Sequence, residues 1–572
     1  LPDAGPFRAT DSPTAPCQAK SMWNVPVIRR WATRYPFPKI AGLACQAVDK
    51  GVDSFVGRLD KSVVHTSAKE LRPAAAAKCR AKMMEECAAE LTHGPFKQCP
   101  WVYARICTIF DIPKNKHTPW DDEIRLISHF SKGGRDGAGS MNVLCYSPRL
   151  IGFHCRAKHL RDMIAQCGKG AMVYAVDVPK CFRRQSIPER LLRLFVYRIL
   201  TEEFGEEFFV DASCPFGWAT SEWKWQCILA ILEWRLLTCI TEHFANVLSY
   251  VDNFFDINRK MPQLVFDRRC AMFDGVFEQA GLVMHEQQKG TQFKGLGWEF
   301  DTEAMVMQCP EDKYLITCKY VAEWNAASVL SCQDWHKAAG ILYWLTEGFR
   351  VCRAAVGYII HDRTRAQALC DRLKLSRRKA MMAKSKQSSS ALKVMAALLP
   401  RWDRRCPIVE GFTPTATWQF LGRVDASTDW GCGGMIVDAS LAQLVGANHE
   451  WSAEERAVAF VSSGESTGVL EAMGALWWLQ TFSTRCRGSR VLLELDNSAA
   501  VLGLQGVYSP TLALLSVIES IAILCCELHV ELRVRHVHGD VFNRVADALS
   551  HNHVEQARRW ATVEFGTPLL FQ

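Results

Sequence analysis

The C-terminal part of the chain contains four acidic residues, each at a defined place in an expected strand or helix. They are Asp425 in the strand RVDAS, Glu471 in the helix VLEAMGALWWLQTF, Asp496 at the end of the strand VLLELDN and Asp547 in the helix NRVADALSHN. From about residue 412 strands and helices alternate, which predicts a sheet with flanking helices. The gaps between the acids are 46, 25 and 51 residues. If the fold gathers these carboxylates, they repel one another unless cations neutralise them.

Such a group of carboxylates is suited to binding divalent metal ions. Mg²⁺ prefers carboxylate oxygens, and Mn²⁺ is the alternative ion. Two such ions activate a water for in-line attack on a phosphodiester. We therefore predict two ions at this site, held by Asp425, Glu471, Asp496 and Asp547. Asp547 alone would more often be an ordinary exposed carboxylate, so the prediction depends on all four acids in order. Glu465 is a rival for Glu471 as the helix acid.

The order of these motifs resembles that of ribonuclease H (RNase H). That family has an Asp-Ala-Ser strand before a Gly-rich hairpin, a Glu helix, an Asp-Asn strand end and a terminal Asn-x-x-x-Asp followed by Leu-Ser. The matching residues are Asp425-Ala426-Ser427, Glu471, Asp496-Asn497, and Asn543 with Asp547-Ala548-Leu549-Ser550. The resemblance implies an RNA–DNA hybrid as the substrate. It also implies that His536 is a catalytic-site histidine that helps product release.

A second pair of carboxylates lies in the N-terminal half. Asp177 ends the apolar run in YAVDVPKCF, and Asp252 interrupts the apolar run SYVDNFF. A carboxylate among Val, Phe and Tyr is costly to bury unless it is paired or bound to a metal, although a lone one is more often a cap or a turn residue. Nucleotidyl transfer needs two hard cations held between carboxylate and phosphate oxygens. The pair therefore predicts a second metal site, at the tips of two strands.

Around these two acids, the motif order over residues 80–310 resembles that of reverse transcriptases, and the layout is most similar to that of DIRS-like and related retroelements. AVDVPKCF resembles the first palm motif and YVDN the Tyr-x-Asp-Asp box. The resemblance implies a fold of fingers, palm and thumb. It also implies that Asp177 and Asp252 are catalytic metal ligands, and it places Asn253 where the family has the second Asp of the box.

The resemblance implies substrate-binding roles for five further residues. Lys114 and Arg125 match a Lys and an Arg that hold the incoming triphosphate. Phe182 matches an aromatic residue that blocks a ribose 2′-OH, Gly217 the glycine of a Pro-Phe-Gly segment, and Lys289 a lysine near the leaving pyrophosphate. The implied partners are an RNA template, a DNA primer, the RNA–DNA hybrid and dNTPs.

Two residues depart from the family pattern. Asn253 is neutral and a weaker ligand for a divalent cation than Asp, and Lys180 places a cation where the family often has Asp. Losing one preorganised electrostatic group costs on the order of 10²–10³ in rate. Two hypotheses follow: an RNA-directed DNA polymerase with RNase H activity from a retrotransposon, or a polymerase-inactive or domesticated nucleic-acid-binding remnant of a retroelement.

These assignments predict an α/β and α+β multidomain chain. We expect reverse-transcriptase fingers and palm over residues 76–320, a thumb or connection with a basic linker over 321–411, and an RNase H-like mixed sheet with flanking helices over 412–560. Residues 1–75 are an N-terminal extension without a readable role, and residues 561–572 a tail.

The net charge and the cysteines indicate which partners and which compartment to expect. The net charge of +8 fits a protein that follows a phosphate backbone without requiring one. The basic, Ser-rich stretch 372–393 predicts a linker or a solvated helix, with a nucleic-acid contact as the alternative. The 24 cysteines form no Cys-x-x-Cys pair, which indicates free thiols in a reducing compartment, in the cytoplasm or the nucleus.

The sequence has no apolar run of about 18 residues, so no membrane span is expected. The chain begins LPDAGPFRAT, without Met, and we expect a fragment of a longer polyprotein.

Overall fold

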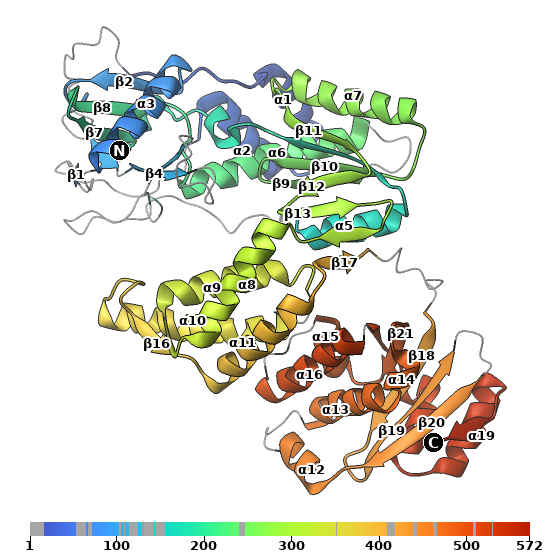
Figure 1. Ribbon diagram of the computed structural model, residues 1–572. Coiled ribbons are helices and arrows are strands. Elements are labelled where there is room, and N and C mark those ends of the chain that lie inside the picture. Colours follow the sequence, from blue (N-terminus) through green and yellow to red (C-terminus); the bar gives the residue numbers. More distant parts are fainter. Residues whose placement is uncertain are drawn as a thin grey trace. The chain divides into compact units, whose positions relative to one another are not determined.

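The computed structural model describes residues 16–52, 65–66, 71–101, 104–107, 109–113, 124–128, 130, 142, 155–239, 246–349, 352–408, 418–438, 443–460, 466–506, 509, 511–528 and 530–572. The chain divides into two compact units: Leu1–Leu296 with Phe300–Met305, and Gly297–Glu299 with Val306–Gln572. Several sheets and many helices confirm the expected mixed α/β, multidomain organisation (Figure 1). Across the described part of the chain, no helix has the length and apolar character that crossing a bilayer requires.

A five-stranded sheet with the order β1-β3-β7-β8-β2 forms one part of the first unit. Its strands are β1 (His65–Thr66), β2 (Thr92–Phe96), β3 (Arg105–Cys107), β7 (Val196–Thr201) and β8 (Gly205–Asp211). Helix α3 (Pro73–Ala88) packs against β2 and β7. Proline at the first position of α3 suits a helix start, because its ring presets φ and the missing N–H would have no partner there. A separate hairpin joins β4 (Ile109–Pro113) to β5 (Ile124–Ser128).

A second, antiparallel sheet has the order β11-β6-β10-β9. Its strands are β6 (Met172–Asp177), β9 (Asn246–Tyr250), β10 (Asn253–Asn258) and β11 (His285–Gly290). Helices α6 (Ala219–Cys239) and α7 (Gln263–Gln279) cover one face, where Tyr174 contacts Phe273 and Phe254 contacts Phe277. Helix α5 (Ala157–Cys167) also contacts β10. The apolar runs that predicted buried strands therefore form the centre of this sheet.

The N-terminal extension contributes two helices to the same core. Helices α1 (Val25–Ala32) and α2 (Pro38–Lys50) both contact α6. Ile28 and Ala44 are fully buried, and the rings of Trp23 and Trp225 lie 5.8 Å apart. This segment showed no clear periodicity in the sequence, yet it is an integral part of the first unit.

The second unit begins with a helical region. It contains α8 (Glu311–Ala326), α9 (Cys332–Leu345), α10 (Cys352–Leu373) and α11 (Lys386–Leu398), with β15 (Val329–Ser331) paired to β16 (Met381–Ala383). Strands β14 (Val306–Gln308) and β17 (Arg405–Pro407) also pair. Residues 372–393, expected as a linker or a solvated helix, comprise the end of α10, an exposed turn, strand β16 and the start of α11. Backbone pairing to β15, far away in sequence, helps to order this stretch.

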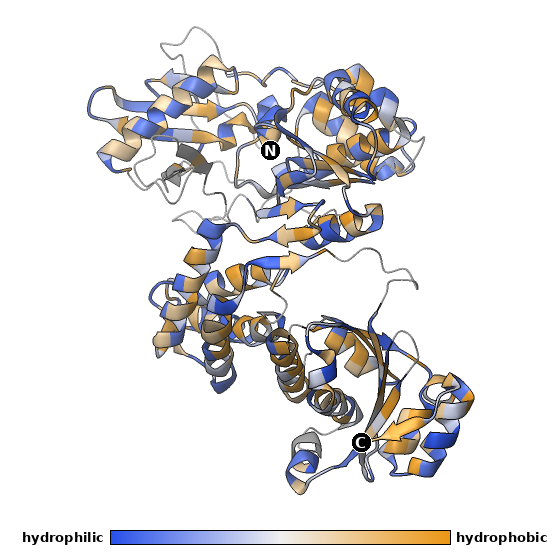
Figure 2. Ribbon diagram, turned by 45° about the vertical axis from the view of Figure 1, so that its right-hand side comes forward, coloured by the Kyte–Doolittle hydropathy of each residue, from blue (hydrophilic) through white to orange (hydrophobic). Residues whose placement is uncertain are grey.

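A six-stranded mixed sheet with the order β22-β21-β18-β19-β20-β23 dominates the rest of the second unit. Its strands are β18 (Phe420–Ala426), β19 (Gly431–Asp438), β20 (Leu444–Glu450), β21 (Arg490–Leu495), β22 (Glu531–His536) and β23 (Leu569–Phe571). One face packs against α13 (Ser466–Thr481) and α16 (Leu512–Leu528), and the other against α18 (Arg544–Ser550) and α19 (Val554–Phe565). Apolar residues line the strands of the sheet (Figure 2).

Helix α16 is shared between two cores of this unit. Ile518 and Ile521 pack in the core of the six-stranded sheet, whereas Leu515 belongs to the core of α8–α11, and Ile523 and Cys526 pack against it. Its sequence, LALLSVIESIAILCCEL, is apolar around most of its circumference, which is typical of a helix enclosed on several sides.

Candidate functional site

Three of the four predicted nuclease carboxylates meet at one edge of the six-stranded sheet. Strands β18 and β21 are parallel and in register, so Asp425 near the end of β18 lies beside Asp496, which directly follows β21. Glu471 reaches the same place from α13. One oxygen of each carboxylate lies within 4.8 Å of the others. Glu465, the rival to Glu471, lies outside the described residues.

This acidic triad is held in an unfavourable electrostatic state. Asp425 is 7% exposed and Glu471 3% exposed. Burial, reinforced by the neighbouring charge of Asp496, raises the pKa of Asp425 to about 7. Burial also raises the pKa of Asp496, and burial with the two aspartates raises that of Glu471 well above its ordinary value. The Glu471 Oε2 atom is buried without a hydrogen-bond partner among the described residues. A hard divalent cation fits this donor set, because it would satisfy the unpaired oxygen and offset the repulsion.

Hydrogen bonds from the two ends of helix α18 orient Asp425. Ser550 Oγ donates to Asp425 Oδ2 over 2.7 Å, and Asn543 Nδ2 donates to the Val424 carbonyl over 3.2 Å and to Asp425 Oδ1 over 3.4 Å. Gly433 pairs with Asp425 across β18 and β19, and a Cβ atom there would lie 2.3 Å from the backbone of residues 549 and 550. The absent side chain therefore lets α18 lie directly on the strand. Asn543 and Ser550 were recognised as motif residues, but their bonds to Asp425 were not foreseen.

Asp547 and His536 lie beside the triad rather than in it. The Asp547 side chain is 60% exposed, and His551 Nε2 lies 3.9 Å from its Oδ1. Its charge nevertheless contributes to the raised pKa values of Asp425 and Asp496. His536, the last residue of β22, hydrogen-bonds the Asp496 carbonyl through Nε2 over 2.9 Å. The structure thus places both residues at the edge of the group.

The predicted polymerase carboxylates also come together. Asp177 ends β6, and Asp252 lies in the two-residue turn between β9 and β10. Asn253 pairs with Asp177 across the strands, and the Val178 N–H donates to the Asp252 carbonyl over 2.8 Å. Val251 has φ 54°, which is uncommon for a β-branched residue, and its carbonyl accepts a hydrogen bond from the Trp225 indole. Tertiary contacts therefore fix this turn.

The two departures from the family pattern have defined partners. Asn253 Nδ2 donates to Asp252 Oδ1 over 2.9 Å, so the amide occupies part of the neighbouring carboxylate instead of adding a negative charge. Lys180 adopts φ 52°, and its Nζ lies 3.0 Å from Glu86 Oε1. The cation that the sequence places near Asp177 is therefore ion-paired with α3.

Three of the predicted substrate-binding residues, Phe182, Gly217 and Lys289, have surroundings that the structure describes. The Phe182 ring packs edge-on against Phe216 of the Pro-Phe-Gly segment, with centroids 5.2 Å apart. Gly217 has φ 95°, and a Cβ atom there would lie 2.4 Å from the Ser128 carbonyl, so the close approach that requires glycine is to β5. Lys289 pairs with Tyr174, and its Nζ lies 5.0 Å from that ring. Because side chains alternate along a strand, Lys289 is on the face of the sheet opposite Asp177.

The two predicted triphosphate ligands are only partly placed. Arg125 lies in β5 opposite Ile112, and its side chain is outside the described atoms. Lys114 lies outside the described residues.

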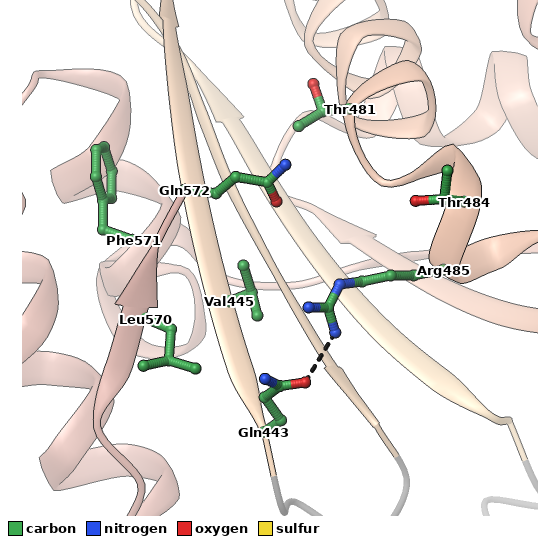
Figure 3. Close-up of a pocket in the computed structure, with 8 residues that line it drawn as sticks. All are labelled: Gln443, Val445, Thr481, Thr484, Arg485, Leu570, Phe571 and Gln572. Carbon is green, nitrogen blue, oxygen red and sulfur yellow. Dashed lines mark hydrogen bonds between the residues drawn. The ribbon is translucent and has the colours of Figure 1, made fainter.

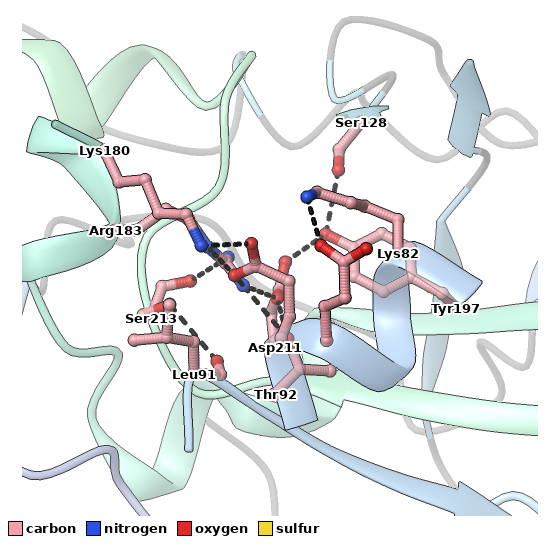
Figure 4. A network of polar contacts seen from close by, with 11 residues as sticks. Lys82, Leu91, Thr92, Ser128, Lys180, Arg183, Tyr197, Asp211 and Ser213 are labelled. Atoms are coloured by element: carbon pink, nitrogen blue, oxygen red, sulfur yellow. Dashed lines mark hydrogen bonds and ion pairs between the residues drawn. The ribbon is translucent and has the colours of Figure 1, made fainter. Parts of the chain in front are cut away.

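A buried ion network that the sequence did not predict fixes the segment after Asp177 (Figure 4). Arg183, 8% exposed, lies 2.8 Å from Asp211, 3.1 Å from Glu86 and 3.0 Å from Thr92 Oγ1. Tyr197 donates its hydroxyl to Asp211 over 2.7 Å. This network anchors Arg183 between α3 and β8, and with it the adjacent residue Phe182. No local pattern in CFRR distinguishes this arginine from a surface one.

A cavity of about 460 Å³ lies at the opposite end of α13 from Glu471 (Figure 3). Its lining residues are Gln443, Val445, Thr481, Thr484, Arg485, Leu570, Phe571 and Gln572. None of the predicted site residues is among them.

Comparisons with known proteins gave structural neighbours only. No family model matches the sequence, and no curated protein is similar to it. The chain is similar in structure to the foamy viral protease-reverse transcriptase dRH in complex with ds DNA, at 10% identity and a TM-score of 0.42, covering 92% of this chain and 84% of that one. It is also similar to the foamy viral protease-reverse transcriptase in complex with an RNA/DNA hybrid, at 10% identity and a TM-score of 0.40. The latter match covers 93% of this chain and 65% of the neighbour's length.

Proposed function

We propose that this chain is an RNA-directed DNA polymerase with RNase H activity, and that its second unit cuts the RNA strand of an RNA–DNA hybrid. The observation that carries the proposal is the acidic triad. Three carboxylates from a strand, a strand end and a helix converge within 4.8 Å, and one buried oxygen has no partner among the described residues. Such a group is costly to maintain without divalent cations.

Asp425, Glu471 and Asp496 would hold Mg²⁺ or Mn²⁺, with Asp547 completing the site for a second ion. Bound there, the ions supply an activated water and stabilise the charge that develops on the phosphodiester. Ser550 and Asn543 fix the orientation of Asp425, which is the usual task of residues behind a metal ligand. His536, whose Nε2 hydrogen-bonds the Asp496 carbonyl, would help release the product.

Cleavage of a labelled RNA–DNA hybrid in Mg²⁺ tests the nuclease assignment. We expect Asp496→Asn to lose activity by about 10²-fold or more, because it removes one preorganised charge of the metal site. Asp429→Asn, which alters an exposed carboxylate just beyond β18, should cleave like the native chain. Undiminished cleavage by Asp496→Asn would sink the RNase H assignment.

The polymerase half of the proposal rests on Asp177 and Asp252 at adjacent strand ends. In it these residues hold the metal ions, and Lys114 and Arg125 bind the triphosphate. Lys289, on the opposite face of the sheet from Asp177, has no part in it. Phe182, braced by Phe216, would select deoxyribose, and Gly217 would support the template. Primer extension on an RNA template with dNTPs tests this half: Asp177→Asn should abolish extension, and equal extension would exclude a catalytic role for Asp177.

A second candidate function is a nucleic-acid-binding remnant without polymerase activity. The bond from Asn253 to Asp252 favours it, because the box then offers one carboxylate instead of two. Primer extension separates the candidates. No extension by the native chain, together with extension by Asn253→Asp, would identify the remnant, whereas native extension would exclude it.

A further inference from the structure

The positive charge of this protein is concentrated in one ordered segment. Residues 372–393 contain eight Lys and Arg and no Asp or Glu, and the formal net charge of the whole chain is also +8. The rest of the chain therefore has no net formal charge. Residues 371–379, at the end of α10 and in the turn that follows it, are all exposed. A localised field of this kind attracts polyanions.

Two arginines in this turn are oriented without being neutralised. Arg377 donates through Nε to Gln367 Oε1 over 3.0 Å, and Arg378 donates through Nε to Gln333 Oε1 over 3.0 Å. Both acceptors are neutral amides, and neither guanidinium is ion-paired within the described residues. These bonds involve only Nε, so the two terminal nitrogens of each guanidinium retain their donors for another ligand. The buried Arg183 and Arg423 instead meet carboxylates.

The turn itself is anchored at both ends. The Gln333 N–H donates to the Arg377 carbonyl over 3.1 Å, and the Cys332 N–H donates to the Ala380 carbonyl over 2.8 Å. On the far side of β16, the Ser385 N–H donates to the buried Asp362 carboxylate over 2.9 Å. Arg377 and Arg378 are thus presented by fixed backbone, which reduces the entropy that a ligand would otherwise have to overcome.

The polar surroundings extend this donor surface. His336 Nε2 lies 3.1 Å from Gln367 Oε1, beside the bond from Arg377, and Gln367 Nε2 donates to Asp371 over 2.8 Å. Asp371 is therefore linked to Arg377 only through the amide. Lys374 and Lys379 flank the pair, and both are exposed. The cluster offers planar, charged donors in the arrangement that suits phosphate oxygens.

We propose that Arg377 and Arg378, held by Gln367 and Gln333, form a phosphate-binding site for the backbone of a nucleic-acid duplex. Backbone contacts of this kind are independent of base sequence. The inference deepens the proposed function, from which it takes the nucleic-acid partner, and it assigns to the α9–α10 region a contact separate from both carboxylate sites.

Fluorescence anisotropy with a labelled 20-bp DNA duplex tests this site on the full chain, in EDTA and from 50 to 300 mM KCl. The variant is Arg377→Gln with Arg378→Gln. The matched control is Arg558→Gln with Arg559→Gln, an adjacent and exposed arginine pair in α19 whose change removes the same formal charge. We expect the first variant to bind on the order of tenfold to a hundredfold more weakly at 100 mM KCl. Its slope of log K against log [KCl] should fall by about 2, because each lost phosphate contact removes about 0.9. The control should bind within about twofold of the native chain.

Two further arms keep the outcomes distinct. Arg377→Lys with Arg378→Lys should recover the salt slope but only part of the affinity, because lysine retains the charge without the planar fork. Thermal melting shows whether a variant lost binding because it unfolded. If the Gln pair has unfolded, the affinity and salt slope of the folded Lys pair decide whether the site exists. Equal losses in the α19 control, or native-like binding by the Gln pair, would overturn the site. Binding to phosphatidylserine vesicles but not to the duplex would assign the surface to a membrane and also overturn it.

The assay separates this inference from the proposed function, because binding in EDTA needs no nuclease activity. Hybrid cleavage by the native chain with native-like duplex binding by the Gln pair refutes the inference alone. If the native chain does not cleave the hybrid but its duplex binding depends on Arg377 and Arg378, the nuclease assignment alone is refuted.

Discussion

Replacing Asp425 by Asn should change how the stability of the metal-free protein depends on pH. Burial and the charge of Asp496 raise the pKa of Asp425 from the ordinary 3.8 to about 7. At about 1.4 kcal/mol per pKa unit, that rise corresponds to about 4 kcal/mol. An acid with a raised pKa binds its proton more tightly in the folded state. Its effect is therefore absent below about pH 4, grows between about pH 4 and pH 7, and destabilises the folded state fully above that range.

Urea denaturation in EDTA at pH 5 and pH 8 measures this effect. We expect Asp425→Asn to gain stability relative to the native chain between the two pH values, by about 3 kcal/mol, because the native chain has already lost part of the roughly 4 kcal/mol at pH 5. Addition of 10 mM MgCl₂ at pH 8 should raise the stability of the native chain but not that of the variant, because the ion binds only the folded site with its carboxylates complete. Asp429→Asn, at an exposed carboxylate, is the control and should follow the native chain. A difference between the native chain and Asp425→Asn that is the same at both pH values would refute the reasoning.

Three other substitutions probe the packing and the chemistry. Gly433→Ala should destabilise the second unit by about 2–4 kcal/mol in urea denaturation, because its methyl group overlaps the backbone of α18; a loss below about 0.5 kcal/mol would show that α18 can shift away. Arg183→Met should cost about 3–5 kcal/mol by the same measurement, because Asp211 would remain buried without a cation and Glu86 would keep only Lys180; native stability would mean that water replaces the guanidinium. Asn253→Asp should raise primer extension by about 10²-fold, whereas Asn253→Ala should not; equal rates in both would exclude a charge effect.

Local pattern and motif order were sufficient to predict the elements that carry the carboxylates. Asp177 and Asp425 end or nearly end apolar strands, and Glu471 lies in a helix whose boundaries follow its apolar run. Because parallel strands end at the same edge, the convergence of Asp425 and Asp496 followed from topology. The periphery of the site was less predictable: Asp547 belongs to the motif but lies outside the triad, since its helix exposes that side chain.

What the sequence did not predict depends on partners far away along the chain. Arg183 is buried because Glu86 and Asp211 converge on it from α3 and β8. Residues 372–393 look like a solvated stretch, but pairing with β15 and a hydrogen bond to Asp362 order part of them. Helices α1 and α2 have only 8 and 13 residues, so their stability comes mainly from packing against α6, which lies far away along the chain.

The shared helix α16 has a consequence for cooperativity. Leu515, Ile523 and Cys526 face the core of α8–α11, while Ile518 and Ile521 face the sheet that carries the acidic triad. Unfolding of either core would expose one side of α16 and would therefore destabilise the other core. We therefore expect the helical region and the six-stranded sheet to melt in one transition, with closely matched amide exchange protection in α10 and β18. A fragment cut free at residue 412 would expose the outer side of α16 and tend to self-associate, so the six-stranded sheet depends on its helical neighbour to stay monomeric.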